Sequence, residues 1–579
     1  MAKRDLVIRV AGEAGEGVLS TGQLITQGAA RAGFGVLTDS VPPAEIKGGH
    51  SFFQIRLSDH RLYSRGDALD ILLAFNEEAY TKNIKELAPG GLLIYDSAEF
   101  TPPESSAYRS YALPLTDLAK NQLQFELAKN VVAVGAVAAL FGMNMEFLNT
   151  LIRERFTRKG EDVLNKNLRA LELGRRYVEE HIPDRDALKI RPGAPATDRI
   201  VVSGNQALAI GALVAGCRRY AGYPITPATD IMEFLAAELP KMGGVVIQAE
   251  DEIAAIGMVL GASYAGYKAM TATSGPGVSL MTEMLGLAAM AEVPAVIVDC
   301  QRAGPSTGMP TRHEQGDLLF CAHGGHGELP RVVLAPVSVA DCFTQAINAF
   351  NLSEEFQTPV ILLSDTVLAV RTESIPRPDV ANVRLVERRR YVPNGTNGHD
   401  GFLRYRLTED GVSPMAVPGT PGGQYVATGL EHNEAGRPRY DPKTHAEFTR
   451  KRFRKLAGAA MAAPPPHRYG DPSAELGVIT WGSTWGAVVE AVDAAAERGL
   501  KVDAIAPRMV WPIPDHQLRP FLEGKRQVLV PEVNYSGQFA QLLQAHFCRE
   551  FTPVNTYGGQ PFKVAELLAA MEGVHQRVG

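Results

Sequence analysis

In the first part of the chain, short apolar runs typical of buried strands alternate with longer stretches whose apolar residues have helical spacing. Short apolar runs such as LVIRVAG (6–12), ILLAF (71–75) and GGLLIYD (90–96) have the length and composition of buried strands. Longer stretches with apolar residues at helical spacing lie between and after them, among them residues 18–34 and 130–143. Strands that alternate with such helices indicate βαβ units and a mostly parallel sheet.

The same alternation returns twice further along. Residues 200–370 alternate VVIQAE, AMTATS and AVIVDC with helical stretches, and the C-terminal part contains ELGVITWGS, VDAIAPRMV and RQVLVPEV. Residues 385–470 are rich in Arg, Gly, Pro and His, so we expect them to lie along other surfaces. The polar, proline-bearing residues 182–199 are a linker candidate. We expect a multidomain α/β protein with domains at 1–183, 198–384 and 471–579 and an extended connecting segment at 385–470.

Composition narrows the functional classes. The chain has 579 residues, too many for one core, and its net charge of −6 argues against a nucleic-acid partner. It contains no apolar run of the roughly 18 residues that a membrane span needs, and we expect its strand-like start not to be a signal peptide. Five cysteines without a CxxC pair fit a reducing cytoplasm and make this chain alone a poor iron–sulfur or zinc host. We expect a cytoplasmic protein that binds neither nucleic acid nor membrane.

Two glycine-rich stretches lie near the N-terminus. GEAGEG (12–17) follows a strand and opens a helix, where backbone N–H groups and the helix dipole favour phosphate. The spacing of its three glycines is not GxGxxG, and its two glutamates would repel an anion. The stretch is therefore either a tight turn or a phosphate or coenzyme contact. EIKGGHS (45–51) is likewise either a surface turn or a ligand loop.

GYPITPAT (222–229) places two prolines directly after an apolar helical stretch. Pro224 and Pro227 hold φ near −65° and restrict the residues before them, so Tyr223 and Thr226 lie on rigid backbone. A hydroxyl such as that of Thr226 can then bind a ligand with little loss of entropy. The alternative is a stiff turn between two helices, which local physics alone favours.

IQAEDEIAAIG (247–257) runs from a strand into an apolar helix through Glu250, Asp251 and Glu252. Acids in a first helical turn usually interact with the helix dipole or cap the helix. Small apolar residues follow Glu252, however, so its carboxylate can face a partly dry site. A desolvated carboxylate has a raised pKa and can share a proton with a ring nitrogen.

TSGPG (273–277) and QRAGPSTGMPTRHEQGD (301–317) each follow a predicted strand, and α/β proteins bind ligands at the carboxyl ends of parallel strands. Arg302 and Arg312 in the second loop suit an organic acid, because guanidinium forks bind carboxylates in bidentate fashion. A solvated basic loop is the alternative. The enzyme patterns GxxxxGK[ST] and HExxH are missing from this sequence.

Taken together, YPITP, QAEDEIAAIG, TSGPG and QRAGPSTGMPT resemble motifs of the 2-oxoacid:ferredoxin oxidoreductase family. The resemblance covers nearly the whole chain and is to the subunit in which a γ domain is fused ahead of the α domains. GEAGEG and KGGH match the γ domain's glycine loops, although the family more often has Gly in place of Glu13. SPMAVPGT (413–420) and TGLEHNEAG (428–436) match the connecting segment, and WGST (481–484) and EVNYSGQFAQLL (532–543) resemble a transketolase C-terminal-like domain.

The resemblance implies that residues 198–384 form the pyrimidine-binding half of a thiamine diphosphate site. The family's GDG motif with its magnesium ligand and the cysteines of its [4Fe–4S] cluster are missing from this sequence. Thiamine diphosphate would therefore be shared with a β subunit that holds Mg²⁺ and the [4Fe–4S] cluster. This chain would bind no metal, and the assembly would be (αβ)2.

The resemblance also implies roles for individual residues. Glu252 rather than Glu250 would hydrogen-bond the aminopyrimidine ring, because its distance from the Gly-Ala pair that follows fits the family spacing. Thr226 would bind the 2-oxoacid and Arg302 its carboxylate, with Arg312 for a distal carboxylate. The further candidates are Glu250, Tyr223, Pro224, Ile225, Ser274, Gly275, Pro276 and Gly277 for the cofactor, Thr311 and His313 for the substrate, and Gly12, Gly15, Gly17, Lys47, Gly48 and Gly49 for coenzyme A.

The implied activity is coenzyme A-dependent oxidative decarboxylation of a 2-oxoacid, with ferredoxin taking the electrons. The γ–α fusion without a ferredoxin-like domain and the second arginine favour 2-oxoglutarate, with succinyl-CoA as product. Pyruvate, or a broad range of 2-oxoacids, stays an alternative. Two further hypotheses are a thiamine enzyme without redox chemistry and a non-catalytic α/β scaffold that binds a nucleotide or coenzyme A through GEAGEG.

Overall fold

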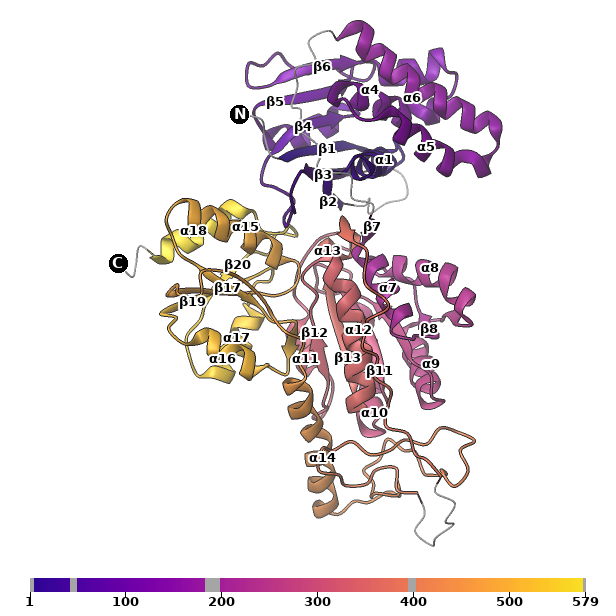
Figure 1. Ribbon diagram of the computed structural model, residues 1–579, viewed down its shortest axis with the longest axis vertical. Helices are drawn as coiled ribbons and strands as arrows, with labels where there is room; N and C mark the ends of the chain where they lie inside the picture. The colour runs from indigo at the N-terminus through magenta and orange to yellow at the C-terminus, as the bar shows by residue number, and fades with distance from the viewer. Residues whose placement is uncertain (1–4, 42–48, 183–197, 394–401, 576–579) are drawn as a thin grey trace. The chain divides into compact units, whose positions relative to one another are not determined.

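The computed structural model describes residues 5–41, 49–182, 198–393 and 402–575 (Figure 1). It divides into two compact units: residues 1–202 with 371–377, and residues 203–370 with 378–579. The strands in the described residues form sheets of eight, seven and five strands, each with helices packed on it. The predicted α/β class is therefore confirmed.

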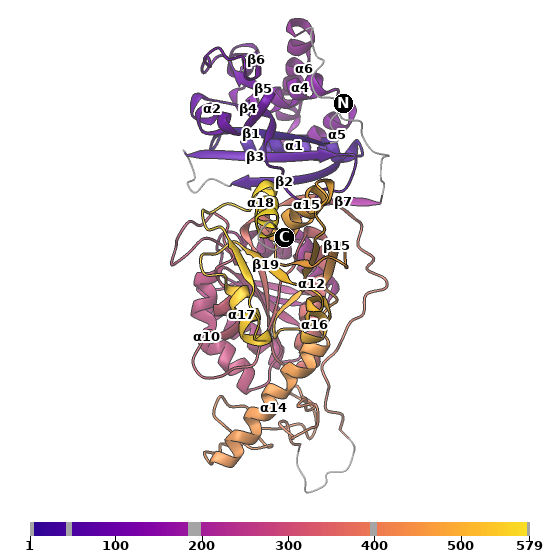
Figure 2. The same cartoon turned by 90° about the vertical axis from the view of Figure 1, so that its left-hand side faces the viewer.

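The first unit has a mixed sheet with strand order β6-β5-β4-β1-β3-β2-β14-β7. Along the row β6-β5-β4-β1 neighbouring strands are parallel, as the sequence predicts. Strand β3 is antiparallel to both of its neighbours, β1 and β2. Figure 2 shows these last three strands side by side. The elements of this unit are β1 (Asp5–Glu13), α1 (Val18–Arg31), β2 (Gly35–Val41), β3 (His50–Ser58), β4 (Leu69–Ala74), α2 (Glu77–Asn83), β5 (Leu87–Asp96), β6 (Arg109–Leu113), α3 (Leu115–Asp117), α4 (Lys129–Phe141), α5 (Met145–Phe156), α6 (Glu161–His181), β7 (Arg199–Ser203) and β14 (Thr372–Pro376).

Strand β14 reaches this sheet from far along the sequence. Glu373 lies opposite Leu37 of β2, and the Thr372 N–H donates a hydrogen bond of 2.8 Å to Thr38 Oγ1. The first unit thus includes two strands, β7 and β14, that lie in sequence inside the expected 198–384 domain. The domain limits given above stay a prediction.

The second unit begins with a sheet of strand order β18-β12-β13-β11-β10-β8-β9, parallel except for β18. Helices α7 and α12 pack against each other, and so do α9 and α10. The elements of this part are α7 (Gly204–Val214), β8 (Arg219–Gly222), α8 (Thr229–Glu238), β9 (Val245–Gln248), α9 (Glu252–Tyr264), β10 (Ala269–Thr273), α10 (Gly275–Met290), β11 (Ala295–Gln301), α11 (Leu318–His323), β12 (Val332–Leu334), α12 (Val339–Phe356), β13 (Pro359–Asp365) and α13 (Thr366–Val370).

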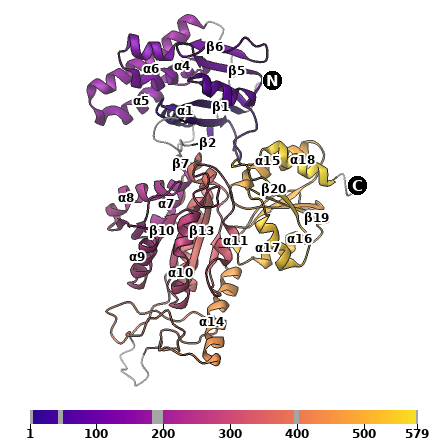
Figure 3. The same cartoon turned by 180° about the vertical axis from the view of Figure 1, so that it is seen from behind.

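A five-stranded sheet of order β15-β17-β16-β19-β20 forms the rest of this unit. Helices α15 and α18 cover one face and α16 and α17 the other (Figures 1 and 3). Strand β18 leaves this part and pairs with β12, and one hydrophobic core includes side chains from both sheets. The elements are α14 (Pro442–Met461), β15 (His467–Gly470), β16 (Leu476–Ile479), α15 (Thr484–Glu497), β17 (Asp503–Ala506), β18 (Met509–Trp511), α16 (Asp515–Leu522), β19 (Gln527–Glu532), α17 (Gln538–Phe547), β20 (Thr552–Asn555) and α18 (Val564–His575).

The connecting segment is anchored by buried charges. The Lys451 ammonium of α14 lies 2.5 Å from Glu292 Oε1, Lys455 pairs with the same carboxylate, and Arg404 donates to the Glu292 carbonyl at 2.7 Å. All four side chains are almost fully buried. The segment therefore packs beside the end of α10 through buried charges as well as through buried apolar side chains such as Phe448 and Leu456. No helix in the described ranges is long and apolar enough to cross a membrane.

Candidate active site

Three of the loops singled out in the sequence meet at one edge of the seven-stranded sheet. Residues 223–228 follow β8, the TSGPG turn follows β10, and residues 302–317 follow β11. Strands β8, β10 and β11 are neighbours and parallel, so their carboxyl ends lie together. This edge is where α/β proteins bind ligands.

The YPITP loop joins strand β8 to helix α8. The alternative considered from the sequence, a stiff turn between two helices, is therefore wrong. The buried Asn205 side chain donates to the Pro227 carbonyl at 2.8 Å, and Arg302 Nη1 donates to the Thr226 carbonyl at 2.9 Å. The side chains of Tyr223 and Thr226 remain exposed. The loop backbone is thus fixed from two sides while the Thr226 hydroxyl faces outward.

The three acids at the start of α9 have different environments. Asp251 is the N-cap, and its carboxylate accepts from the Ala254 N–H at 2.8 Å. Glu250 is exposed, whereas Glu252 is only 5% exposed. A methyl group placed on Gly277 would lie 2.7 Å from Glu252 Oε1, so this carboxylate packs on the first turn of α10. The capping role belongs to Asp251 and leaves Glu252 available for chemistry.

The start of α10 contains an unsatisfied polar group. Ser274 is the N-cap residue and fully buried, but its side chain makes no capping hydrogen bond. Its Oγ has no hydrogen-bond partner in the part of the chain that the structure describes. Buried hydroxyls are normally paired, so a group of this kind fits a bound ligand.

Arg302 is the buried cation of this edge. Its side chain is 9% exposed, and its Nε has no hydrogen-bond partner among the described residues. Burial lowers its pKa from the ordinary value, while the carboxylate of Asp317 opposes that shift. A guanidinium with an unused donor can bind a carboxylate.

The other substrate candidates of this loop lie further along it. Thr311 and Arg312 are half-buried, and Arg312 packs beside Gly559 of the C-terminal part. His313 is buried: its Nδ1 lies 3.6 Å from Asp365 Oδ1 and its Nε2 lies 3.5 Å from Ser483 Oγ. His313 therefore interacts with buried groups of the fold, and its contact with substrate stays a prediction.

Gln315 explains why the two C-terminal motifs lie against this loop. Its Nε2 donates to the Trp481 carbonyl at 3.2 Å, and its Oε1 accepts from Thr484 Oγ1 at 2.9 Å. The Val533 N–H donates to the same Oε1 at 3.1 Å, and Asn534 Nδ2 donates to the Gln315 carbonyl. WGST and EVNYSGQ thus hold the second half of the ligand loop. Sequence reasoning missed Gln315, because these contacts join residues far apart in the chain.

Two acids near this edge were also missed. Asp317 ends the loop, and a methyl group on Gly275 would lie 2.5 Å from its Oδ2. Asp299 of β11 is fully buried, and its Oδ2 accepts from Cys321 Sγ at 3.4 Å. Among the described residues, no group of His, Cys, Asp or Glu side chains could hold a metal ion.

The two glycine stretches of the first unit meet each other. The Ala14 N–H donates to the Gly49 carbonyl at 3.1 Å, and Gly15 and Gly17 have positive φ values of 105° and 85°. Glu16 closes the turn, since its Oε2 accepts from the Glu13 N–H at 2.7 Å. The Glu16 carboxylate thus occupies the Glu13 N–H, a backbone donor that a bound phosphate would need. Lys47 and Gly48 lie outside the described residues, and the coenzyme A contacts stay a prediction.

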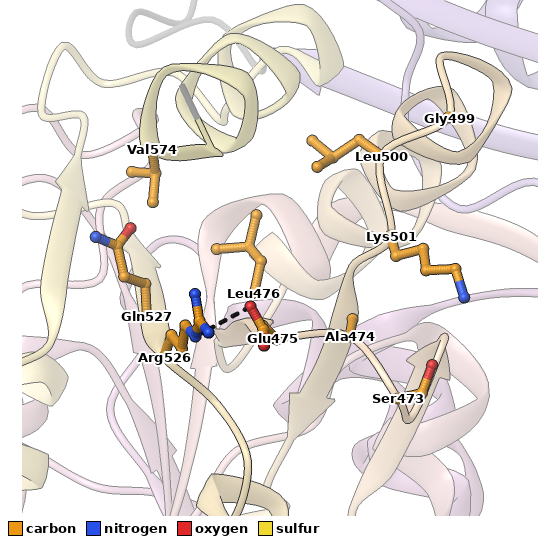
Figure 4. A pocket seen from close by; sticks show the side chains of 10 residues that line it. All are labelled: Ser473, Ala474, Glu475, Leu476, Gly499, Leu500, Lys501, Arg526, Gln527 and Val574. Atoms are coloured by element: carbon orange, nitrogen blue, oxygen red, sulfur yellow. Dashed lines mark ion pairs between the residues drawn. The ribbon is translucent and has the colours of Figure 1, made fainter. Parts of the chain in front are cut away.

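A cavity of about 400 Å³ lies at the amino ends of β16 and β19 (Figure 4). Arg526 and Glu475 form an ion pair of 3.2 Å in it. The loops described above meet the other, carboxyl end of β16, so this cavity is separate from them. It is lined by Ser473, Ala474, Glu475, Leu476, Gly499, Leu500, Lys501, Arg526, Gln527 and Val574.

Comparison with known proteins decides the family. Residues 7–177 match the model for pyruvate ferredoxin/flavodoxin oxidoreductase, residues 210–451 its thiamine diphosphate-binding domain, and residues 474–567 core domain II of pyruvate:ferredoxin oxidoreductase. Subunit alpha of 2-oxoacid:ferredoxin oxidoreductase 2 from Aeropyrum pernix is 31% identical over 98% of this chain and 98% of its own. The chain belongs to the 2-oxoacid:ferredoxin oxidoreductase family. The family resemblance read from the sequence motifs is therefore confirmed, and the protein is an oxidoreductase.

Other members of the family are also similar over their whole length. The 2-oxoglutarate oxidoreductase subunit KorA of Mycobacterium tuberculosis is 37% identical over 97% of this chain and 90% of its own. A solved structure of 2-oxoglutarate:ferredoxin oxidoreductase from Magnetococcus marinus, with 2-oxoglutarate, coenzyme A and succinyl-CoA bound, is 42% identical. It superimposes with a TM-score of 0.93 over 99% of both chains.

Proposed function

We propose that this chain is the γ-fused α subunit of a 2-oxoglutarate:ferredoxin oxidoreductase. The observation that carries the proposal is the end-to-end match to the Magnetococcus marinus enzyme at 42% identity. The reaction is 2-oxoglutarate plus coenzyme A giving succinyl-CoA, CO2 and one proton, with two electrons passed to ferredoxin. A β subunit supplies the diphosphate half of the cofactor site, Mg²⁺ and the [4Fe–4S] cluster, in an (αβ)2 assembly.

The residues at the sheet edge fit the pyrimidine half of thiamine diphosphate. Ser274 offers a buried hydroxyl without a protein partner, and Glu252 a buried carboxylate not used for capping. Thiamine diphosphate, when bound, supplies the nucleophilic carbon and the electron sink for decarboxylation of a 2-oxoacid. In this proposal the Glu252 carboxylate hydrogen-bonds the aminopyrimidine nitrogen and holds the proton there, because it is buried and is not used for capping.

Arg302 and Thr226 would orient the substrate. The Arg302 guanidinium is bonded to the Thr226 carbonyl and has an unused Nε donor, so it can bind the 2-oxoacid carboxylate beside the outward-facing Thr226 hydroxyl. Arg312, with Thr311, is the candidate for the distal carboxylate that distinguishes 2-oxoglutarate from pyruvate. Holding the acid in one orientation is what this chain contributes to the rate.

Reconstitution with the β subunit tests the proposal. The complex should reduce a viologen dye with 2-oxoglutarate and coenzyme A, and Glu252→Gln should abolish most of this activity. Glu250→Gln is the matched control, because Glu250 is exposed two residues away and should leave the rate within about twofold.

Each alternative has its own signature in the same experiment. Equal rates with pyruvate would keep the family and remove the substrate assignment. Decarboxylation without dye reduction would favour a thiamine enzyme without redox chemistry. A complex that binds coenzyme A but turns over no 2-oxoacid would favour a non-catalytic scaffold.

A further inference from the structure

The loop that follows β11 closes on itself between its two arginines. The Ala303 N–H donates to the Arg312 carbonyl at 3.0 Å, and the Met309 N–H donates to the Ala303 carbonyl at 2.9 Å. Arg302 directly precedes Ala303, so the two arginines lie on either side of one backbone hydrogen bond. The fold thus brings both cations of this loop to the same end of it.

The Arg312 guanidinium has no protein partner of its own. The side chain is half-buried, and it forms neither a hydrogen bond nor an ion pair with any residue that the structure describes. Arg302, by contrast, already donates to the Thr226 carbonyl. A half-buried guanidinium without a carboxylate partner can bind an organic acid. A dicarboxylate has one carboxylate for each of these two arginines.

Gly559, in the loop between β20 and α18, limits where the Arg312 side chain can lie. Gly559 is buried, and its carbonyl accepts from the His313 N–H at 3.3 Å, one residue beyond Arg312. A methyl group on Gly559 would lie 3.1 Å from both Arg312 Cβ and Met309 Cε. Its φ of 74° is also a conformation that residues with a side chain rarely adopt. Backbone conformation and side-chain contact therefore both require glycine here.

The neighbouring glycine differs on each of these points. Gly558 is exposed, its φ is not positive, and a methyl group on it would meet no atom within 4 Å. A turn that needed small residues only for its own backbone would not explain why Gly559 alone of the pair contacts Arg312. The contact with the arginine stem is what distinguishes position 559.

Resting on the proposed function, we propose that Gly559 is a positioning residue that determines specificity for a dicarboxylate, because it holds the Arg312 guanidinium where the distal carboxylate binds. A side chain at position 559 would have one of two effects. It would leave positive φ and move the carbonyl away from the His313 N–H, or it would keep this φ and push the Arg312 stem aside. Either effect displaces the guanidinium, and the loss falls on substrates that have a second carboxylate.

The test compares wild type with Gly559→Ala in the reconstituted complex with its β subunit. The KM for 2-oxoglutarate should rise about tenfold, because a displaced guanidinium loses hydrogen bonds to the carboxylate, and kcat should change less. The KM for 2-oxopentanoate, which has a methyl group in place of the distal carboxylate, should stay within about twofold. Gly558→Ala is the matched control and should leave both KM values within about twofold of wild type.

Binding of inert analogues gives a readout that needs no turnover. Glutarate is a dicarboxylate with the carbon number of 2-oxoglutarate, and pentanoate is the corresponding monocarboxylate. Calorimetry should show glutarate binding to Gly559→Ala about tenfold more weakly than to wild type, while pentanoate binding changes less than about twofold. If Gly559→Ala folds poorly, Gly559→Asn replaces it, because asparagine adopts positive φ more readily and still places a Cβ against Arg312.

Arg312→Met shows whether Gly559 acts through the arginine. Methionine keeps an unbranched stem and removes the guanidinium, so Gly559→Ala should weaken glutarate binding by less than about twofold in the Arg312→Met background. Equal losses for glutarate and pentanoate, or a full effect of Gly559→Ala without the guanidinium, would overturn the inference. A complex that shows the expected glutarate pattern but does not turn over 2-oxoglutarate would support the role of Gly559 and count against the proposed function.

Discussion

Replacing Glu292 by glutamine would remove the anion that three buried cations surround. Its carboxylate pairs with Lys451 and Lys455, and Arg404 bonds to its carbonyl. These cations hold the pKa of Glu292 well below the ordinary value in spite of its burial. Glutamine has nearly the same volume, so Glu292→Gln changes charge and leaves packing almost unchanged.

The expected loss follows from the burial of the partners. Removing one partner of a buried ion pair costs about 3–5 kcal/mol, because the remaining charges stay desolvated. The unit that contains Glu292 has about 370 residues, and unfolding entropy is about 2.1 cal/mol/K per residue. These values correspond to a fall in melting temperature of about 4–6 °C. The loss should be largest near pH 6, where Lys455 is protonated.

Scanning calorimetry of the purified complex at pH 6 measures this shift. Glu283→Gln is the matched control: the same substitution on helix α10, which ends two residues before Glu292, at an exposed position without an ion pair in the described structure. It should move the midpoint by less than about 1 °C. The double variant Glu292→Gln/Lys455→Met should recover part of the loss, because one unpaired cation is gone. A midpoint for Glu292→Gln within 1 °C of wild type would refute the reasoning.

A methyl group at Gly277 would lie 1.9 Å from Thr273 Oγ1 and 2.7 Å from Glu252 Oε1, so Gly277→Ala should displace Glu252 and lower kcat about a hundredfold. An unchanged kcat would show that this packing does not position the acid. Arg302→Lys should raise the KM for 2-oxoglutarate about tenfold or more, because lysine lacks the bidentate fork, and an unchanged KM would contradict the substrate contact. Burial and neighbouring cations lower the pKa of Lys455 to about 7, below its unfolded value, so the free energy of unfolding should rise from pH 7 toward 10. Urea titrations should show a flatter rise in Lys455→Met, and an equal rise would exclude this lysine as the cause.

The sequence could predict candidate site residues where the chemistry is local. Glu252 follows a strand and begins an apolar helix, and both features can be read from neighbouring residues. Spacing favoured Glu252 over Glu250, and the fold adds that Asp251 is the cap and that Glu252 is buried. Gln315 could not be singled out, because its hydrogen bonds to Trp481, Thr484 and Val533 join segments that lie far apart in the sequence.

The fold could be predicted where the hydrophobic pattern of the sequence reflects which side chains are buried. Helix α14 was missed because the residues it buries include Lys451, Arg452 and Lys455, which a hydrophobic pattern reads as exposed. Strand β18 was read as part of the C-terminal sheet, since VDAIAPRMV is continuous in sequence. It pairs instead with β12, a contact between distant segments that no local pattern contains.

Strand β14 has a consequence for how the protein is made. The sheet of the first unit lacks this strand until residue 376 has left the ribosome, although β1 to β6 are complete by residue 113. At about 5–20 residues per second, β2 waits roughly 13–50 s with an unpaired edge. An exposed edge strand is a template for pairing with other chains. A fragment that ends near residue 183 would keep this edge exposed, so fragments of the first unit should have residues 371–377 fused to them or be supplied with these residues as a peptide.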